Sequence, residues 1–181
     1  MIRVISGIYK GRVLSIPSEK VTRPTMDKVR QAIFSIISKN IEDSVFLDLF
    51  AGSGAVGIEA VSRGAKKVYF NEKNISAYKV IEKNISSLDI EDDKYVLFLK
   101  DYRLFLKKHR DTVFDIVFLD PPYRFKVNRD IILYMRENSM LSKEAIIISE
   151  QDEKNKDIDG FEKKEYTYSS KYVSIYRRIE E

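Results

Sequence analysis

The pattern of hydrophobic and polar positions changes near residue 44. From there, short apolar runs alternate with stretches in which apolar residues recur every three or four positions, the spacing of a helix that packs on one face. The predicted strands are 45–49, 67–71, 95–99, 114–119 and 145–149. The predicted helices are 55–62, 75–87, 102–108 and 127–138, and a charged loop follows at 151–159. Repeated strand and helix units of this length predict a mostly parallel, doubly wound α/β sheet.

The two ends of the chain add shorter elements to this core. Two β-prone runs at 2–6 and 12–16 are separated by a glycine-containing segment and predict a small N-terminal β-hairpin. A helical pattern follows Arg23 and Pro24, and Thr25 is the candidate N-cap of that helix. The two C-terminal runs are 162–167 and 172–178. They predict an antiparallel hairpin that raises the sheet to seven strands.

Composition limits the classes of protein to which the chain can belong. Its 181 residues suit one domain with a small appendage, and 44% hydrophobic residues are enough for a core. There is no run of 18 apolar residues, and the N-terminus lacks a signal-peptide layout. The absence of cysteine excludes disulfides, thiolate metal sites and a cysteine nucleophile. We therefore expect a cytoplasmic protein with no membrane span and no metal site.

The net charge of +4 is distributed unevenly along the chain. Of the 32 Lys and Arg residues and the 28 Asp and Glu residues, eight and two respectively lie in the first forty positions. The basic character therefore belongs to one end of the chain. A localised positive surface indicates a polyanionic partner, although a solvated, lysine-rich surface has the same composition.

The sequence Asp120-Pro121-Pro122-Tyr123 directly follows the apolar run 114–119. Proline lacks a backbone N–H, so nearby carbonyls stay available as acceptors, and the Asp120 carboxylate adds acceptor oxygens. Together with the flat ring of Tyr123, these groups suit a planar base that carries an exocyclic amine. Because Asp-Pro-Pro also ends strands without any chemistry, the tetrapeptide alone leaves a turn and an amine-binding site equally open.

Residues 52–57 match the pattern G-x-G-x-x-G between a predicted strand and a predicted helix. Glycines at such a turn let the backbone approach a ligand closely at the N-terminus of a helix. Glu72 stands at the end of the next strand, 20 residues after Gly52, where a carboxylate can bind ribose hydroxyls. The arrangement predicts a cofactor that contains a nucleoside.

Asp48 bears on the identity of that cofactor. A carboxylate on the approach to the glycine loop would repel a pyrophosphate but attract an ammonium or sulfonium group, which favours S-adenosylmethionine over a dinucleotide. The lone histidine, His109, stands in a polar stretch and is expected at the surface, so it offers no hydride-transfer site. Asp101 follows the strand 95–99 and can accept from an adenine amine, cap the next helix, or do both.

Taken together, these segments resemble a known family. The segments similar to the motif series of class I S-adenosylmethionine-dependent N-methyltransferases are residues 48–57, Asn71-Glu72-Lys73, Asp101 and residues 120–123. The segments that narrow the resemblance are residues 3–7, Lys10-Gly11-Arg12 and residues 23–34. With them the chain looks like the bacterial RsmD family, the 16S ribosomal RNA guanine-N2 methyltransferases, from residue 3 to about residue 150.

The resemblance implies a Rossmann-like class I methyltransferase fold and a role for each matching residue. A basic hairpin and helix at 1–40 would contact RNA and cover the site, and residues 41–181 would form the catalytic domain that binds S-adenosylmethionine. The cofactor-binding residues would be Asp48, Ala51, Gly52, Gly54, Glu72 and Asp101. The catalytic residues would be Asp120, Pro121 and Tyr123. The substrate-binding residues would be Lys10, Arg12, Arg23 and Thr25. The expected partner is 16S rRNA or the small ribosomal subunit, and a monomer is expected.

Three alternatives stay open from the residues alone. A related N-methyltransferase could act on adenine or on a protein amide, although Asp rather than Asn at position 120 argues against these. An NAD-dependent oxidoreductase would bind a nicotinamide cofactor in place of S-adenosylmethionine. A non-catalytic RNA-binding module would have no need of residues 120–123 beside a cofactor loop.

Overall fold

The computed structural model describes residues 2–18, 24–122, 126–168 and 171–179, apart from the side chains of residues 24–26. Within these residues, seven strands form one sheet in the order β5-β4-β3-β6-β7-β9-β8. Their bounds are β3 Val45–Asp48, β4 Lys67–Glu72, β5 Tyr95–Leu99, β6 Phe114–Leu119, β7 Leu141–Gln151, β8 Phe161–Tyr168 and β9 Lys171–Arg178. The strands from β5 to β7 are parallel, whereas β9 is antiparallel to both β7 and β8. The predicted mostly parallel sheet with a C-terminal hairpin is confirmed.

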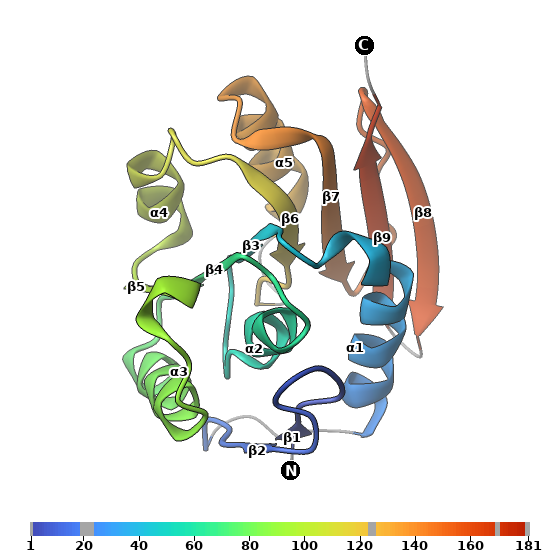
Figure 1. The fold of residues 1–181 in the computed structure, drawn as a ribbon. Helices are drawn as coiled ribbons and strands as arrows, with labels where there is room; N and C mark the ends of the chain where they lie inside the picture. Colours follow the sequence, from blue (N-terminus) through green and yellow to red (C-terminus); the bar gives the residue numbers. More distant parts are fainter. Residues whose placement is uncertain (1, 19–23, 123–125, 169–170, 180–181) are drawn as a thin grey trace.

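Helices cover both faces of the sheet (Figure 1). On one face lie α1 Pro24–Ile36, α2 Ala55–Ser62 and α3 Ile75–Ser87, and on the other α4 Tyr102–Lys108 and α5 Asn128–Glu137. Two short 3-10 turns, η1 Ser38–Asn40 and η2 Asp92–Lys94, precede β3 and β5. Strands buried on both faces are apolar throughout, which is why the runs in the sequence show no alternation. Each helix in the described ranges is too short or too polar to cross a membrane.

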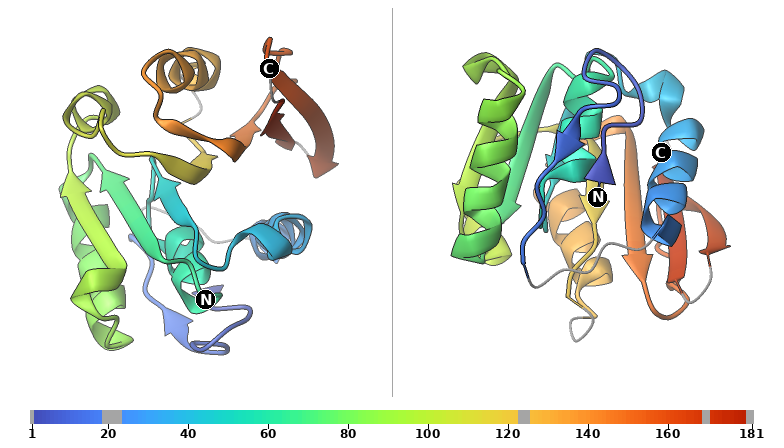
Figure 2. Two further views of the ribbon diagram at one scale, coloured as in Figure 1. Left: turned by 45° about the horizontal axis from the view of Figure 1, so that its top comes forward. Right: turned by 90° about the horizontal axis from the view of Figure 1, so that it is seen from below.

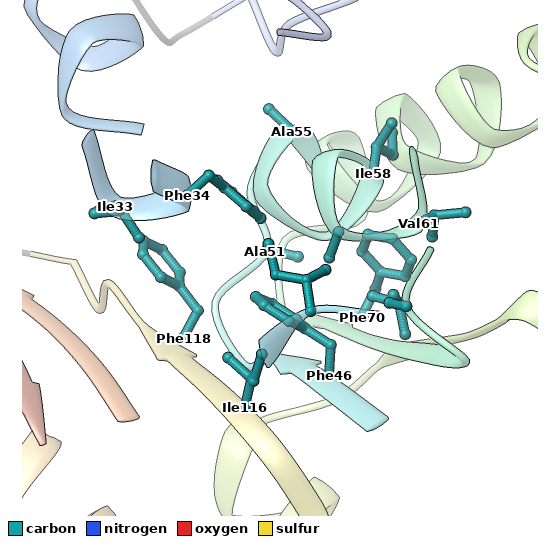
Figure 3. Packing of buried hydrophobic residues seen from close by; sticks show 14 of the residues in the cluster. Ile33, Phe34, Phe46, Ala51, Ala55, Ile58, Val61, Phe70, Ile116 and Phe118 are labelled. Carbon is teal, nitrogen blue, oxygen red and sulfur yellow. The ribbon is translucent and has the colours of Figure 1, made fainter. Parts of the chain in front are cut away.

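The core between the sheet and α1 and α2 is built from aromatic and branched side chains (Figure 3). Phe34 of α1 stacks on Phe46 of β3 with 6.4 Å between ring centroids. Ile33 lies beside Phe118 of β6, so α1 is anchored over the strand that leads to Asp120. The basic N-terminal segment and the sheet therefore share one hydrophobic core on this face.

The N-terminal hairpin packs on the outer side of α2 and α3 (Figure 2). It consists of β1 Ile2–Arg3 and β2 Val13–Leu14, which pair antiparallel. The backbone N–H groups of Ile5 and Ser6 donate to the two carboxylate oxygens of Glu59 at 2.7 and 2.9 Å. Glu59 is fully buried in α2, so the hairpin is held by a charge-assisted contact out of water. The predicted hairpin is confirmed, with paired strands shorter than the predicted runs at 2–6 and 12–16. The division of the chain at residue 40 stays a prediction.

The boundaries of α1 and β7 also differ from the prediction. Helix α1 begins at Pro24, so Thr25 lies in its first turn and is not the N-cap. Proline suits the first helical position because its missing N–H has no partner there in any helix. Strand β7 begins at Leu141 and ends at Gln151, well outside the predicted 145–149. Lys143 and Glu144 are exposed within it and interrupt the apolar run that the prediction followed.

Candidate active site

The predicted site residues meet where the carboxyl ends of the parallel strands reach the same edge of the sheet. The chain places β4 on one side of β3 and β6 on the other, so the order of the strands reverses there. In open α/β sheets, ligands bind in the crevice at such a reversal. Asp48 ends β3, Glu72 ends β4, and Asp120 follows β6. The structure therefore brings together the cofactor and acceptor motifs that the sequence separates.

The glycine loop connects β3 to α2 with two residues in the left-handed region. Gly52 has φ 57° and Gly54 has φ 78°, and Gly54 is the residue that precedes α2. The positive φ of Gly54 strains any other residue, and a Cβ there would also lie 3.1 Å from the side chain of Ile81 in α3, a tight contact that Ile81 would have to relieve. Ala51 is fixed to the neighbouring strand because its N–H donates to the carbonyl of Asn71 at 3.0 Å.

Asp48 lies beneath this loop and is only 1% exposed. Its Oδ2 accepts a hydrogen bond from the N–H of Gly57 in the first turn of α2 at 3.2 Å. A carboxylate in this position also benefits from the positive end of the helix dipole. Asp48 thus fastens the loop to the start of α2, and its predicted contact with the cofactor stays a prediction.

Glu72 is held in one orientation by three backbone donors. Its Oε2 accepts from the N–H of Gly52 at 2.8 Å, and its Oε1 accepts from those of Lys73 and Asn74 at 2.8 Å each. An ionised carboxylate has about four acceptor positions, so one fixed in this way retains capacity for a hydroxyl group. The geometry joins the glycine loop directly to the predicted ribose-binding residue.

Asn71, which precedes Glu72, belongs to a segment that carries the family resemblance, but no role of its own was predicted for it from the sequence. It is 2% exposed, and its Nδ2 donates to the carbonyls of Leu49 and Lys100 at 3.2 Å each. One side chain therefore links the ends of three neighbouring strands around the crevice. A signal was present in the sequence, since an amide inside an apolar strand needs partners when it is buried.

Asp101 caps α4 by accepting from the N–H of Arg103 at 3.0 Å, which is one of the two roles that the sequence left open. Its Oδ2 also lies 3.5 Å from the Nζ of Lys73, in the loop that follows Glu72. The residue after it, Tyr102, packs on Phe50 of the glycine loop with 5.5 Å between ring centroids. Glu72 and Asp101 therefore lie at the ends of neighbouring strands, close to the rings of Phe50 and Tyr102. The contact of Asp101 with adenine stays a prediction.

Asp120 and Pro121 lie on the other side of the glycine loop. The N–H of Leu49 donates to the carbonyl of Phe118 at 3.3 Å, which joins the start of that loop to the end of β6. Asp120 is half-buried and Pro121 is buried. Tyr123 lies outside the described residues, so its predicted stacking role stays a prediction.

Asn128 supports the same strand end from α5 and was also not identified from the sequence. It is 1% exposed, and its Nδ2 donates to Ser149 Oγ at 2.8 Å and to the carbonyl of Leu119 at 3.4 Å. The residue immediately before Asp120 is therefore fixed both to α5 and, through Ser149, to β7.

The predicted RNA-contacting residues lie on the hairpin or outside the described residues. Lys10 and Arg12 are exposed on the hairpin, and Arg12 Nη2 donates to the carbonyl of Ser87 at the end of α3 at 2.6 Å. Arg23 and the side chain of Thr25 lie outside the described residues. The exposure of the first two fits a role in binding a polyanion, and all four assignments stay predictions.

Asn84 of α3 connects this hairpin to the glycine loop. Its Oδ1 accepts from the N–H of Ser15 at 2.8 Å, and its Nδ2 donates at 3.0 Å to the carbonyls of Ser15 and Ser53. The side chain is buried, with 1% of the residue exposed. The candidate RNA-contacting segment and the candidate cofactor loop are thus held by the same amide.

The expectation of a surface His109 is met only in part, because the residue is half-buried. The ring lies 4.5 Å from those of Phe98 and Phe105 and 5.7 Å from that of Tyr69, between centroids. Burial among these rings, with the positive charge of Lys108 nearby, lowers the pKa of His109. The polar neighbours of His109 in the sequence gave no sign of aromatic partners on other elements, and its position makes it part of the packing of α4.

Comparison with known proteins places this geometry among methyltransferases. The family model described as "Conserved hypothetical protein 95" matches residues 2–177. Ribosomal RNA small subunit methyltransferase D of Haemophilus influenzae is 36% identical, over 82% of this chain and 78% of that protein. The protein of the same name from Escherichia coli K12 is 34% identical, over 85% of this chain and 76% of that protein. A solved structure of the Escherichia coli protein yhhF has 30% identity and a TM-score of 0.88, and covers 99% of both chains. The predicted Rossmann-like class I fold is confirmed.

Proposed function

The chain belongs to the ribosomal RNA small subunit methyltransferase D family, and we propose that it methylates the exocyclic N2 amine of a guanine in 16S rRNA. The observation that carries the proposal is the position of Asp120 and Pro121 across β3 from the fixed carboxylate of Glu72. The residues proposed to bind the guanine amine and the acid proposed to bind the cofactor thus lie on either side of one glycine loop. Family membership leaves no support for the NAD-dependent oxidoreductase.

S-adenosylmethionine is the cofactor that the residues of the crevice fit, and it supplies a methyl group activated by a sulfonium. Glu72 would bind the ribose hydroxyls, because its carboxylate is already oriented by Gly52, Lys73 and Asn74. Asp101 would bind the adenine amine beside the ring of Tyr102. The methionine part would lie against the backbone of the loop that turns at Gly52 and Gly54, close to the buried Asp48.

The residues after β6 prepare the acceptor nitrogen. The lone pair of a guanine N2 amine is delocalised into the ring, so the amine is a weak nucleophile. Hydrogen bonds from its two protons to the Asp120 carboxylate and the Pro121 carbonyl favour a pyramidal nitrogen with its lone pair directed at the methyl group. With the cofactor bound, the methyl group would pass from sulfur, which keeps the bonding pair, to that lone pair, and the Asp120 carboxylate or water would take one N2 proton. Positioning supplies most of the acceleration in such a displacement.

The base has to leave its stack to reach the crevice, so the target is a flipped or looped nucleotide. Lys10 and Arg12 on the hairpin would contact phosphates, which fix the position of the RNA without reading its sequence. Because Asn84 holds the hairpin against the glycine loop, RNA bound there lies at a fixed distance from the cofactor.

The direct test is transfer of labelled methyl from S-adenosylmethionine to unmodified small ribosomal subunits and to protein-free 16S rRNA. The RNA is then digested to nucleosides, and the methylated nucleoside and its position are identified by mass spectrometry. We expect N2-methylguanosine at a single position. Label in adenosine or in protein, or no transfer to either substrate, would refute the proposal.

A further inference from the structure

A cavity of about 200 Å³ lies against Pro121, on the side of the acceptor residues away from the cofactor loop. Its walls come from Pro121, from the end of β7 and the loop that follows, and from Lys171 at the start of β9. A single water needs only about 10–15 Å³ of such space, so the cavity has room for a larger polar group. No residue assigned above to the cofactor lines it within the part of the chain that the structure describes.

The register of the sheet places Glu150 next to Asp120. Leu119 of β6 is paired with Ser149 of β7, so the following residues, Asp120 and Glu150, stand at the ends of adjacent parallel strands. Adjacent strands are about 4.8 Å apart. Glu72 lies in the opposite direction, since β4 and β7 are on different sides of β3 and β6. A base whose amine is bound at Asp120 would therefore extend toward Glu150.

Lys171 lies on β9, the strand next to β7, at the same edge of the sheet as Asp120 and Glu150. Gln151 of β7 is paired with Tyr172 of β9, which brings the first residue of β9 to the same edge of the sheet. Lys171 Nζ is 3.8 Å from Glu150 Oε1 and 3.0 Å from Asp152 Oδ1. The side chain of Glu150 is 15% exposed and that of Lys171 is 20% exposed. A carboxylate and an ammonium group thus stand side by side on the wall of the cavity.

The order of these groups matches the Watson–Crick edge of guanine. That edge presents the N2 amine and the N1–H as donors and then O6 as an acceptor. An ionised carboxylate is an acceptor only, and an ammonium group is a donor only. The sequence Asp120, Glu150, Lys171 across β6, β7 and β9 therefore opposes N2, N1 and O6 in turn. Adenine would place the N1 acceptor against the carboxylate and a donor against the ammonium group.

The walls of the cavity are held by buried polar contacts. Ser149 Oγ donates to Asn155 Oδ1 at 2.7 Å, and the hydroxyl of Tyr176 donates to the carbonyl of Lys156 at 2.6 Å. Both contacts attach the loop after β7 to the sheet. At the rim, Lys126 lies 2.9 Å from Glu153. A wall fixed in this way can discriminate between bases, because a misplaced polar group would stay unpaired.

We propose that Glu150 and Lys171 are specificity-determining residues that select guanine by its N1–H and O6, an inference that rests on the proposed guanine-N2 methylation. Glu150 accepts from N1–H and Lys171 donates to O6 while the amine is bound at Asp120. Before the base enters, Lys171 lies between Asp152 at 3.0 Å and Glu150 at 3.8 Å, so its ammonium group is already directed toward this wall of the cavity.

The test compares small-subunit RNA with guanine or 2,6-diaminopurine at the position methylated by the wild-type protein. Diaminopurine keeps the 2-amino acceptor but has an acceptor at N1 and a donor at position 6. We expect wild-type kcat/KM to favour guanine by about tenfold to a hundredfold, the usual discrimination of a paired contact. Glu150→Gln, whose amide can donate to N1, should reduce that ratio by at least about tenfold. Lys171→Gln, whose carbonyl can accept from the 6-amino group, should reduce it as well.

Glu162→Gln is the matched control, because it makes the same change at an exposed position on β8 and should leave the ratio unchanged. An unaltered ratio in Glu150→Gln would overturn the inference while leaving the proposed function intact. If Glu150→Gln does not fold, the same ratio of kcat/KM values measured for Lys171→Gln is the test, and an unaltered ratio would overturn the inference. A wild-type protein that methylates no guanine N2 would overturn the proposed function and, with it, this inference.

Discussion

Replacement of Asn84 by alanine tests whether one buried amide joins the RNA-contacting hairpin to the cofactor loop. The substitution removes two hydrogen bonds with Ser15 and one with Ser53, all between 2.8 and 3.0 Å. A neutral hydrogen bond contributes about 0.5–1.5 kcal/mol net, and a partner left buried and unpaired adds to the loss. We therefore expect the free energy of unfolding to fall by about 2–4 kcal/mol.

The assay is equilibrium denaturation in urea, combined with titrations of S-adenosylmethionine and of target RNA. Because the amide contacts both segments, we expect Asn84→Ala to weaken binding of both ligands under conditions in which the variant is folded. The control is Asn138→Ala at the C-cap of α5, where Nδ2 makes a single described contact, to the carbonyl of Tyr134 at 2.8 Å. That variant should lose less than about 1.5 kcal/mol and bind both ligands normally. Equal losses of stability in the two variants, or unchanged ligand binding in Asn84→Ala, would refute the reasoning.

Three further predictions follow from the site and its surroundings. Asp120→Ala should bind S-adenosylmethionine normally yet lose methyl transfer by at least about a hundredfold, as for other positioned polar groups, and near-normal turnover would exclude the assigned role. Changing Lys10 and Arg12 to alanine should weaken RNA binding and reduce the slope of log affinity against log salt by about 0.7–0.9 per lost phosphate contact, whereas an unchanged slope would identify a solvated surface. Because burial lowers the pKa of His109 in the folded state, the neutral ring stabilises the protein above about pH 6.5, and this contribution is lost as the pH falls toward the folded pKa. Urea denaturation should show a smaller decline below that pH in His109→Phe, and identical pH profiles would contradict the assignment.

Local patterns predicted the elements of the fold because parallel strands are apolar along their whole length. The bounds of α2, β5, α4 and β6 match the prediction residue for residue. The start of α1 was misplaced because Pro24 was interpreted as lying before the helix. Thr25, the next residue, then had the position and residue type of an N-cap. The ends of β7 were missed because its pairing extends beyond its apolar centre, as far as Leu141 and Gln151.

The candidate site was predicted in part, and the missing part consists of contacts between distant residues. Glu72 and Asp101 were found because the first ends a strand and the second follows one, positions that the sequence reveals. Asn84 was missed because its partner Ser15 is 69 residues away, and no local pattern encodes such a contact. The ring contacts of His109 were missed for the same reason, since its partners Tyr69 and Phe98 come from β4 and β5.

The position of β3 between β4 and β6 has a consequence for the order in which the protein acquires its ligand sites. The pairs β3–β4 and β4–β5 join segments close in the chain, whereas Val45 of β3 reaches its partner Asp115 across 70 residues. Contacts of long sequence separation form slowly because the intervening chain has to be closed first. During synthesis from the N-terminus, the strands that carry the glycine loop, Glu72 and Asp101 are complete before β6 and β7 exist. We expect the nascent chain to organise its cofactor half first, and to gain the residues that bind the acceptor base as β6 and then β7 join the sheet.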